Sequence, residues 1–367
     1  MFGGAFQGKS VWLSGHTGFK GSWLAAWLLR LGARVHGFAL EPTTNPSLFE
    51  QLGLGSRLEH EIGDIRDPAA VERSIQRAAP DFVFHLAAQP LVRLSYEQPV
   101  ETYHTNVMGT VHIADSLRRL DRACAAVFVT TDKCYENREW VHSYREEDPL
   151  GGYDPYSSSK GAAEIAIAAY RRSFFGAHPV KIASARAGNV IGGGDWAVDR
   201  IVPDSIRALQ RGEAIPVRNK RSTRPWQHVL EPLSGYLCLA ARLADEPRNS
   251  QLCSAFNFGP ALSSNRTVAE LVQELLKHWP GVWADRSDPQ AVHEATLLNL
   301  ATDKAFHLLG WSPVWAFTDT IANTAAWYRS ANDPSTASAK DLLRLTEAQI
   351  EDYECRASHM GLTWTQS

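Results

Sequence analysis

The chain has 367 residues, of which 44% are hydrophobic and 21% are charged, a balance typical of a globular protein of about two domains. Its net charge of −3 and the absence of a long apolar run argue against partners such as nucleic acid or a membrane. Five scattered cysteines without metal-binding spacing argue against a disulfide framework and against a metal site. Because the first residues lack the pattern of a signal peptide, we expect a cytoplasmic protein.

The first 190 residues alternate apolar strands with helical patterns. Apolar residues recur at helical spacing in the segments between the strands. We expect strands at 9–13, 34–40, 57–62, 81–88, 125–131 and 180–187, and helices at 23–31, 68–78, 99–120 and 162–174. This alternation predicts an α/β fold, a Rossmann-type doubly wound parallel sheet with helices on both faces.

After residue 189 the pattern loosens into short strands and helices, including a helix at 267–279. A smaller α/β substrate-binding domain, interleaved with the first, fits this pattern. We expect a cofactor domain of residues 1–188 plus about 225–259, and a substrate domain of residues 189–224 plus about 260–335. Residues 336–367 match no pattern, and we expect their last part, residues 356–367, to be a mobile tail.

Two glycine patterns compete near the N-terminus. Residues 3–10 match GxxxxGK[ST], the pattern of a phosphate-binding loop of ATP-binding proteins. Such a loop follows a strand and opens a helix, whereas only two residues precede this one and a strand follows it. We therefore interpret residues 3–10 as an exposed N-terminal arm.

The second pattern, at Gly15, Gly18 and Gly21, lies between a strand and a helix, as dinucleotide binding requires. These glycines allow, in turn, a tight turn, close approach of a pyrophosphate, and close packing of helix on strand. Further cofactor-binding candidates lie in this loop and at later strand ends: Phe19, Asp64, Ile65, Ala87 and Ala88. The carboxylate of Asp64 suits an adenine amino group, although turn formation and packing explain these later residues equally well.

The choice between NAD and NADP rests on the end of the second strand. An acidic residue there binds the ribose hydroxyls of NAD, whereas an arginine accommodates the extra phosphate of NADP. Glu41 is displaced from the usual position and is otherwise an exposed loop carboxylate, but no arginine follows the strand. The sequence therefore favours NAD.

Two short motifs carry acid–base chemistry. Tyr156 and Lys160 are four residues apart at a helix start, so the ammonium is expected to lower the pKa of the phenol and make it a base. Thr131, Asp132 and Lys133 follow the fifth strand, whose end faces the ligand crevice. The last two form a second acid–base pair, which a simple alcohol dehydrogenase does not need. The alternative is a solvated surface salt bridge.

Long segments resemble a known family. The chain is similar over roughly residues 6–330 to the extended short-chain dehydrogenase/reductases and, within them, to the CDP-glucose 4,6-dehydratases. Related dehydratases carry Thr-Asp-Glu where this chain has Thr-Asp-Lys at 131–133, and the lysine is typical of the CDP-glucose branch. The matching segments are 15–24, 63–67, 84–99, 105–110, 130–140, 151–160, 186–196 and 224–236.

The resemblance implies an NAD-dependent lyase that acts on CDP-glucose in deoxysugar and O-antigen biosynthesis. Tyr156 would deprotonate the 4-hydroxyl, Lys133 would remove the C5 proton, and Asp132 would protonate the departing 6-hydroxyl. Asn189 and Arg224 would bind the phosphates, for which amide and guanidinium donors are suited. Weaker substrate-binding candidates are Arg200 and His293, and Trp226 either stacks on the base or packs in the core.

The family also implies a homodimer or a homotetramer. Two other functions remain open at this point. An epimerase or ketoreductase on the same scaffold needs Tyr156 and Lys160 but no second acid–base pair, so residues 132 and 133 discriminate against it. A catalytically silent NAD-binding regulator would be expected to lack Tyr156 or Lys160, and both are present.

Overall fold

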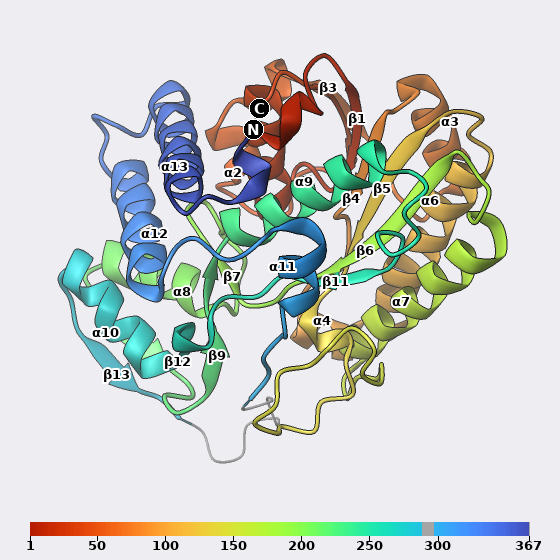
Figure 1. Cartoon of the computed structure of the whole chain (residues 1–367). Helices are drawn as coiled ribbons and strands as arrows, with labels where there is room; N and C mark the ends of the chain where they lie inside the picture. The colour runs from red at the N-terminus through yellow and green to blue at the C-terminus, as the bar shows by residue number, and fades with distance from the viewer. Residues whose placement is uncertain (288–296, 367) are drawn as a thin grey trace.

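The computed structural model describes residues 1–287 and 297–366. A seven-stranded parallel sheet forms its centre, in the order β11–β6–β5–β4–β1–β2–β3, which confirms the predicted doubly wound fold (Figure 1). The strand order reverses between β1 and β4, the point at which such sheets bind ligands. The strands are β1 (Ser10–Ser14), β2 (Arg34–Ala39), β3 (Glu59–Ile62), β4 (Phe82–His85), β5 (Cys124–Val129), β6 (Val180–Arg186) and β11 (Ala255–Asn257).

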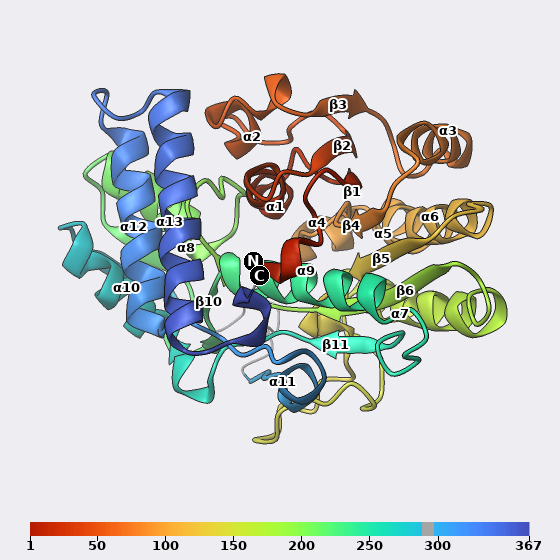
Figure 2. The same ribbon diagram turned by 45° about the horizontal axis from the view of Figure 1, so that its top comes forward.

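Helices cover both faces of the sheet, because side chains alternate along each buried strand. In β1, Val11 and Leu13 join the core that contains α1 and α9, whereas Trp12 joins the core formed with α3, α6 and α7 (Figure 2). These helices are α1 (Phe19–Arg30), α9 (Leu230–Asp245), α3 (Pro68–Ala78), α6 (Gly109–Arg118) and α7 (Pro155–Phe174).

The helix predicted at 99–120 contains an irregular turn. It consists of α5 (Pro99–Tyr103), a π-helical turn η3 (His104–Met108), and α6. The π-helical turn carries Asn106, whose amide nitrogen donates to the Ser159 hydroxyl at 2.9 Å and whose oxygen accepts from the Gln89 amide at 2.8 Å. The irregular turn thus connects this helix to α7 and to the segment after β4.

A smaller lobe lies beside the sheet, on the left in Figure 2. Its strands form three separate pairs: β7 (Val190–Ile191) with β10 (Gln227–His228), β8 (Ile215–Val217) with β13 (Trp283–Asp285), and β9 (Thr223–Pro225) with β12 (Asn265–Thr267). Its helices are α8 (Ile201–Gln210), α10 (Val268–His278) and α12 (Phe317–Asn332). The remaining elements are η1 (Phe2–Gly4), α2 (Leu48–Gln51), η2 (Leu54–Ser56), α4 (Val92–Glu97), η4 (Asp132–Cys134), η5 (Leu262–Ser264), α11 (Asp303–Leu309), α13 (Ala339–His359) and η6 (Thr363–Thr365).

The prediction for the C-terminal end is wrong, whereas that of an exposed arm holds for five of the eight residues at 3–10. The expected mobile tail at 356–367 forms the last turn of α13 and η6, and Trp364 near its end is 4% exposed and stacks on Phe2 with ring centroids 4.9 Å apart. In the N-terminal arm Phe6 is the residue that packs: it is 1% exposed, and its ring centroid lies 4.7 Å from that of Phe82. The reason is apolar burial: α13 carries a stripe of residues at helical spacing that includes Leu342, Ile350 and Tyr353.

None of the helices in the described residues is long and apolar enough to cross a membrane.

Candidate active site

The glycine loop joins β1 to α1 at the point where the strand order reverses. Gly15 has a φ of +77°, and a Cβ there would meet the Ala87 nitrogen at 2.7 Å. A Cβ at Gly21 would lie 2.0 Å from the Gly15 oxygen, so the helix packs directly on the turn. Gly18 is the N-cap of α1, and Phe19 begins the helix. A bare backbone turn at a helix N-terminus fits a pyrophosphate group.

The residues predicted to contact adenosine lie just beyond the ends of β2 and β3. Asp64 lies after β3, and the hydrogen bonds and charge of Arg66 hold the pKa of its carboxyl below the usual range. Ile65 is 4% exposed and packs against Gly109 of α6, which makes it a core residue as well. Glu41 is exposed just beyond β2, where the Thr17 hydroxyl of the loop donates to the Leu40 carbonyl at 2.9 Å.

A histidine pair supports the loop, and it was not predicted. His16 is fully buried, and its Nε2 lies 2.7 Å from Nδ1 of His60 on β3. Burial lowers the pKa of His16 to about 3, so the ring is neutral. His16 thus anchors the glycine loop to two strands: its ring bonds to His60 of β3, and a Cβ at Gly37 of β2 would meet the same ring at 2.4 Å.

Tyr156 and Lys160 lie in the first turns of α7, as predicted. Asp154 caps this helix by accepting from the Ser157 amide at 2.9 Å, and Pro155 is at its first position. The amide of Tyr156 donates to the Ser95 hydroxyl at 3.1 Å. Tyr156 is 9% exposed and Lys160 6%, so both lie inside the protein.

The expected fall in the pKa of Tyr156 is wrong for this state of the protein. Burial raises the pKa of Tyr156 to about 12, and the opposing contributions come from the Thr131 hydrogen bond and the Arg200 charge. Burial also lowers the pKa of Lys160 to about 8. Desolvation by burial is therefore the largest influence on the pKa of both groups, which sequence spacing alone does not reveal.

The turn after β5 brings Asp132 close enough to Tyr156 for its charge to act on the phenol, and Lys133 is half-buried beside it in η4. Asp132 is 2% exposed, accepts from the Thr131 hydroxyl at 2.9 Å, and lies 3.4 Å from the side-chain nitrogen of Asn189. A Cβ at Gly188 would lie 1.9 Å from the Asp132 carboxylate. The alternative of a solvated surface salt bridge is wrong, because the carboxylate of Asp132 is buried.

The structure places the predicted substrate-binding residues in different environments. Arg200 faces the site: it donates to Asp195 at 2.8 Å, and its charge acts on Tyr156. Arg224 lies on β9 and donates to the Ser222 hydroxyl at 2.5 Å. Trp226 is 6% exposed and its indole donates to the Arg266 carbonyl, so it is a core residue rather than a stacking platform for a base. His293 lies outside the described residues.

Lys20 and Tyr236 were missed as members of the site. The ammonium of Lys20 donates to the Tyr236 hydroxyl at 3.3 Å. Burial lowers the pKa of Lys20 to about 7, and the charges of Arg200, Asp132 and Lys160 act on it. A lysine inside the glycine loop was the available signal, but its partner on α9 is remote in sequence.

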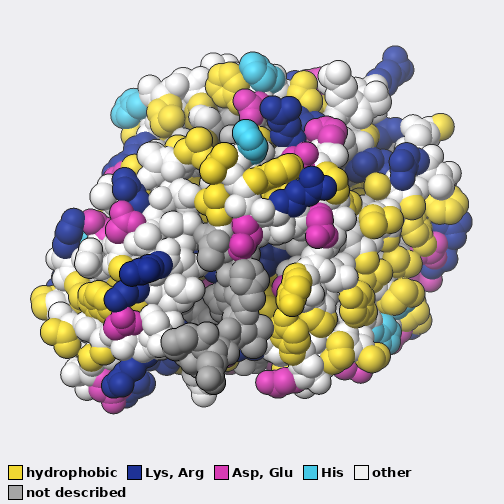
Figure 3. Space-filling model, turned by 90° about the horizontal axis from the view of Figure 1, so that it is seen from below, with side chains coloured by type: hydrophobic (Ala, Val, Ile, Leu, Met, Phe, Trp, Pro, Cys, Tyr) yellow, Lys and Arg dark blue, Asp and Glu magenta, His cyan; other side chains and the backbone are white. Residues whose placement is uncertain are grey.

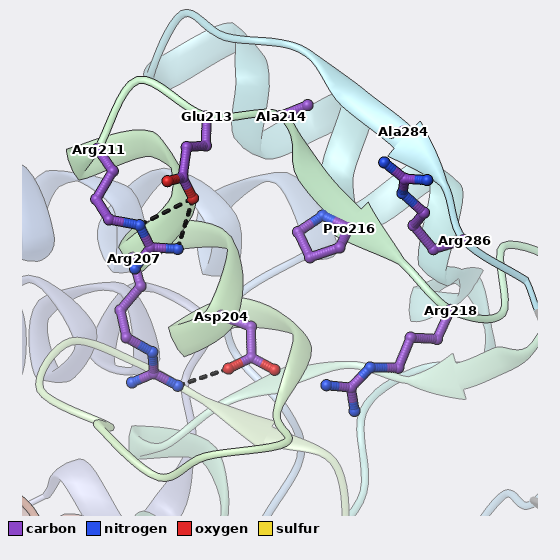
Figure 4. A pocket seen from close by; sticks show the side chains of 9 residues that line it. All are labelled: Asp204, Arg207, Arg211, Glu213, Ala214, Pro216, Arg218, Ala284 and Arg286. Carbon is purple, nitrogen blue, oxygen red and sulfur yellow. Dashed lines mark hydrogen bonds and ion pairs between the residues drawn. The ribbon is translucent and has the colours of Figure 1, made fainter.

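An arginine-rich cavity lies apart from these residues, between α8 and the β8–β13 pair. It has a volume of about 400 Å³. Figure 4 shows Arg207 paired with Asp204 and Arg211 paired with Glu213, while Arg218 and Arg286 reach in from the strand side. The cavity is positively charged on balance, but it does not include the catalytic candidates on α7 and η4.

The fold and the Tyr–Lys pair define the class of the protein, an extended short-chain dehydrogenase/reductase. The sequence model of the GDP-mannose 4,6 dehydratase family matches residues 13–324. The chain belongs to this family.

Known proteins agree with this assignment. A CDP-glucose 4,6-dehydratase of Salmonella typhimurium is 48% identical over 355 residues, which cover 95% of this chain and 97% of that protein. The dTDP-glucose 4,6-dehydratase of Streptomyces venezuelae, solved with NAD bound, has a TM-score of 0.73 at 23% identity and covers 87% of this chain and 96% of its own. A UDP-glucose 4-epimerase of Thermotoga maritima has a TM-score of 0.74 at 20% identity, and the likeness covers 88% and 99% of the two chains.

Proposed function

We propose that the protein catalyses the NAD-dependent dehydration of CDP-D-glucose to CDP-4-keto-6-deoxy-D-glucose. The observation that supports this proposal is that Asp132, just after β5, and Tyr156, at the start of α7, are both buried and that the charge of Asp132 acts on Tyr156. The likeness to the Salmonella CDP-glucose 4,6-dehydratase over nearly the whole chain supports the choice of substrate. Epimerases and ketoreductases need only the tyrosine and the lysine.

The glycine loop and the N-terminus of α1 would hold NAD, which supplies hydride acceptance at C4 of the sugar and hydride return at C6. Gly15 and Gly21 leave no room for a side chain, so the backbone forms the binding surface. Phe19 begins the helix at this surface, and Ala87 lies against the turn. Ala88 follows at the end of β4, and Asp64 and Ile65 follow β3 near the expected adenine.

Tyr156 accepts the proton of the 4-hydroxyl, and the Thr131 oxygen is a hydrogen-bond partner of the same hydroxyl. Because burial raises the pKa of Tyr156 to about 12, its deprotonation needs positive charge close by. Lys160 on the same helix and Arg200 opposite supply that charge.

Elimination follows at the second pair. Once C4 is a ketone, the proton on C5 is acidic, and Lys133 removes it as a base. Asp132 gives its proton to the departing 6-hydroxyl, which leaves as water. Asn189 holds the side chain of Asp132 at 3.4 Å, and we propose that Asn189, Arg200 and Arg224 also bind the substrate.

We further propose that cofactor and substrate are bound by the two domains expected from the sequence. Residues 1–188 plus about 225–259 hold the cofactor, and residues 189–224 plus about 260–335 hold the nucleotide sugar. Cytoplasmic location and a role in making deoxysugars for O-antigen stay predictions.

A homodimer or a homotetramer is the proposed assembly. Large apolar side chains are exposed along α4 to α7, and hydrophobic side chains gather on the α7 side of the face drawn in Figure 3. The exposed apolar side chains on the helices from α4 to α7 are those of Tyr96, Val100, Tyr103, Met108, Ile165 and Phe174. Light scattering of the purified protein tests this, since a monomer mass would contradict it.

Product mass tests the activity. The protein is incubated with CDP-, dTDP-, UDP- and GDP-glucose in turn, with added NAD. We expect loss of one water from CDP-glucose only. Unchanged mass with a changed sugar configuration would instead indicate an epimerase, and no reaction with any of the four would contradict the proposal.

A further inference from the structure

A buried carboxylate lies between the two catalytic motifs. Glu164 is on α7, one turn after Lys160, and its side chain is 3% exposed. Its Oε1 accepts from the Thr130 hydroxyl at 2.5 Å, and its Oε2 accepts from the Ser184 hydroxyl at 2.8 Å and from Arg186 at 2.9 Å. One side chain therefore joins α7 to the end of β5 and to β6.

Arg186 extends this contact to the other side of the catalytic turn. Its guanidinium is 4% exposed and donates through Nη1 to the Tyr135 hydroxyl at 2.8 Å and to the Glu146 carbonyl at 3.0 Å. Tyr135 in turn donates to the Asn257 side chain at 2.7 Å. Thr130 precedes residues 131–133 and Tyr135 follows them. Glu164 therefore holds one end of this turn and Arg186 holds the other.

Glu164 remains ionised in the interior. Burial opposes its charge, but the charge of Arg186 and the hydrogen bonds it receives hold the pKa of the carboxyl below its usual value. Glu164 is four residues from Lys160 on the same helix, and its charge makes the largest contribution that opposes the lowering of the Lys160 pKa by burial. Other titratable groups that interact with Lys160 or Glu164 are Cys134 of η4, Lys20 of α1, His85 of β4 and Arg171 of α7, and Tyr156 lies one turn before Lys160 on α7.

We propose that Glu164 is a positioning residue of the reaction: it fixes the catalytic turn of β5 against α7 and keeps Lys160 in its ammonium form near Tyr156. This inference rests on the proposed roles of Tyr156 and Lys160. Without the carboxylate, Lys160 loses its proton at a lower pH, and Tyr156 loses the positive charge that favours its deprotonation.

The pH profile of the Glu164→Gln variant tests this role. We measure kcat and KM for CDP-glucose from about pH 6 to about pH 10, with NAD saturating. The alkaline limb of the kcat profile is expected to move by about one pH unit or more to lower pH, with a smaller change in KM. Glu164→Asp keeps the charge, so its profile should lie close to that of the unmodified protein. Glu72→Gln, on the half-exposed surface of α3, is the matched control and should shift nothing.

A purely structural role predicts a different result. If Glu164 had only a structural role, its loss would lower kcat by the same factor at every pH. The kcat–pH profile of Glu164→Gln would then have the same shape as that of the unmodified protein, and this result would overturn the inference. Because Glu164→Gln leaves Arg186 without its counter-ion, the Glu164→Gln/Arg186→Met variant is measured as well. It removes both charges, and an unshifted profile in this folded variant would also overturn the inference.

Two further variants show whether the proposed catalytic roles of Tyr156 and Lys160 are wrong, independently of the role of Glu164. If Tyr156→Phe and Lys160→Met keep normal activity, the proposed catalytic roles are wrong. If both variants lose activity while the Glu164→Gln profile is unshifted, only the role of Glu164 is wrong.

Discussion

Trp27 of α1 and Glu354 of α13 lie 327 positions apart and share a buried hydrogen bond of 2.8 Å from the indole nitrogen to the carboxylate. α1 begins in the glycine loop, so the C-terminal helix is fastened to the helix expected to face the cofactor. Arg30 of α1 adds an ion pair to the same carboxylate at 3.6 Å. The C-terminal helix is thus part of the support of the loop.

Glu354→Ala is expected to lower the free energy of unfolding by about 1–3 kcal/mol, because it leaves a buried indole nitrogen without its acceptor. Urea denaturation followed by circular dichroism measures the change. Glu351→Ala is the control: it faces the same Arg30 at 3.6 Å but is 69% exposed, so a change within about 0.5 kcal/mol is expected. Equal effects of the two substitutions would contradict the role of the buried bond.

Glu231 makes a separate prediction about pH. Its carboxyl is fully buried and accepts from the Trp315 amide at 2.7 Å and from the Tyr353 hydroxyl at 2.7 Å. Burial raises the pKa of Glu231 to about 7 from an ordinary value of 4.5. The folded protein therefore keeps a proton that the unfolded chain releases between these two values.

A raised folded-state pKa means stability that is fully present below about pH 4.5 and is lost as the pH rises through about 7. Relative to Glu231→Gln, the unfolding free energy should fall by at most about 1.4 kcal/mol per pH unit over this range and then level off. Denaturation curves at several pH values measure the difference. A difference that does not vary with pH would show that Glu231 has an ordinary pKa.

Tyr156→Phe removes one hydroxyl and should lower kcat by about 10²- to 10⁴-fold, because the proton of the 4-hydroxyl then has no acceptor. The fold and the binding of NAD should be unaffected, as thermal melting and cofactor titration would show. Tyr170→Phe, further along α7, controls for loss of a tyrosine hydroxyl from this helix and should keep normal turnover. Normal turnover in Tyr156→Phe would mean that another group is the base.

Lys133→Met separates oxidation from elimination. The variant should still exchange the C4 hydride of the sugar with bound NAD, but it should not exchange the C5 proton with solvent deuterium, because the base is missing. Nuclear magnetic resonance of recovered CDP-glucose in deuterium oxide measures the second exchange. If C5 exchanges at the normal rate, Lys133 is not the base.

The sheet was predictable because its signals are local. Apolar runs of strand length separated by helical spacing identify six of the seven strands of the sheet, all but β11, and the glycine pattern between β1 and α1 identifies the loop. The C-terminal helix was missed although Leu342, Ile350 and Tyr353 are at helical spacing. The surface that buries this stripe is formed by segments remote in sequence, so the apolar residues alone did not show that the helix would pack.

Parts of the site were beyond sequence reasoning for a similar reason. The motifs at 131–133 and 156–160 were readable, and so was Arg200. The contacts of Lys20 with Tyr236 and of Glu164 with Arg186 join different elements, so no spacing reveals them. The direction of the Tyr156 pKa depends on burial, which is a property of the folded chain.

Deuterium tracing tests the central claim most directly. CDP-glucose labelled with deuterium at C4 is converted by the purified protein, and the product is examined by mass spectrometry and nuclear magnetic resonance. We predict loss of one water, deuterium at C6 of the product, and no accumulation of NADH, because the two hydride steps cancel within one turnover. Product without loss of water, or label lost from the sugar into free NADH, would contradict the proposed dehydratase.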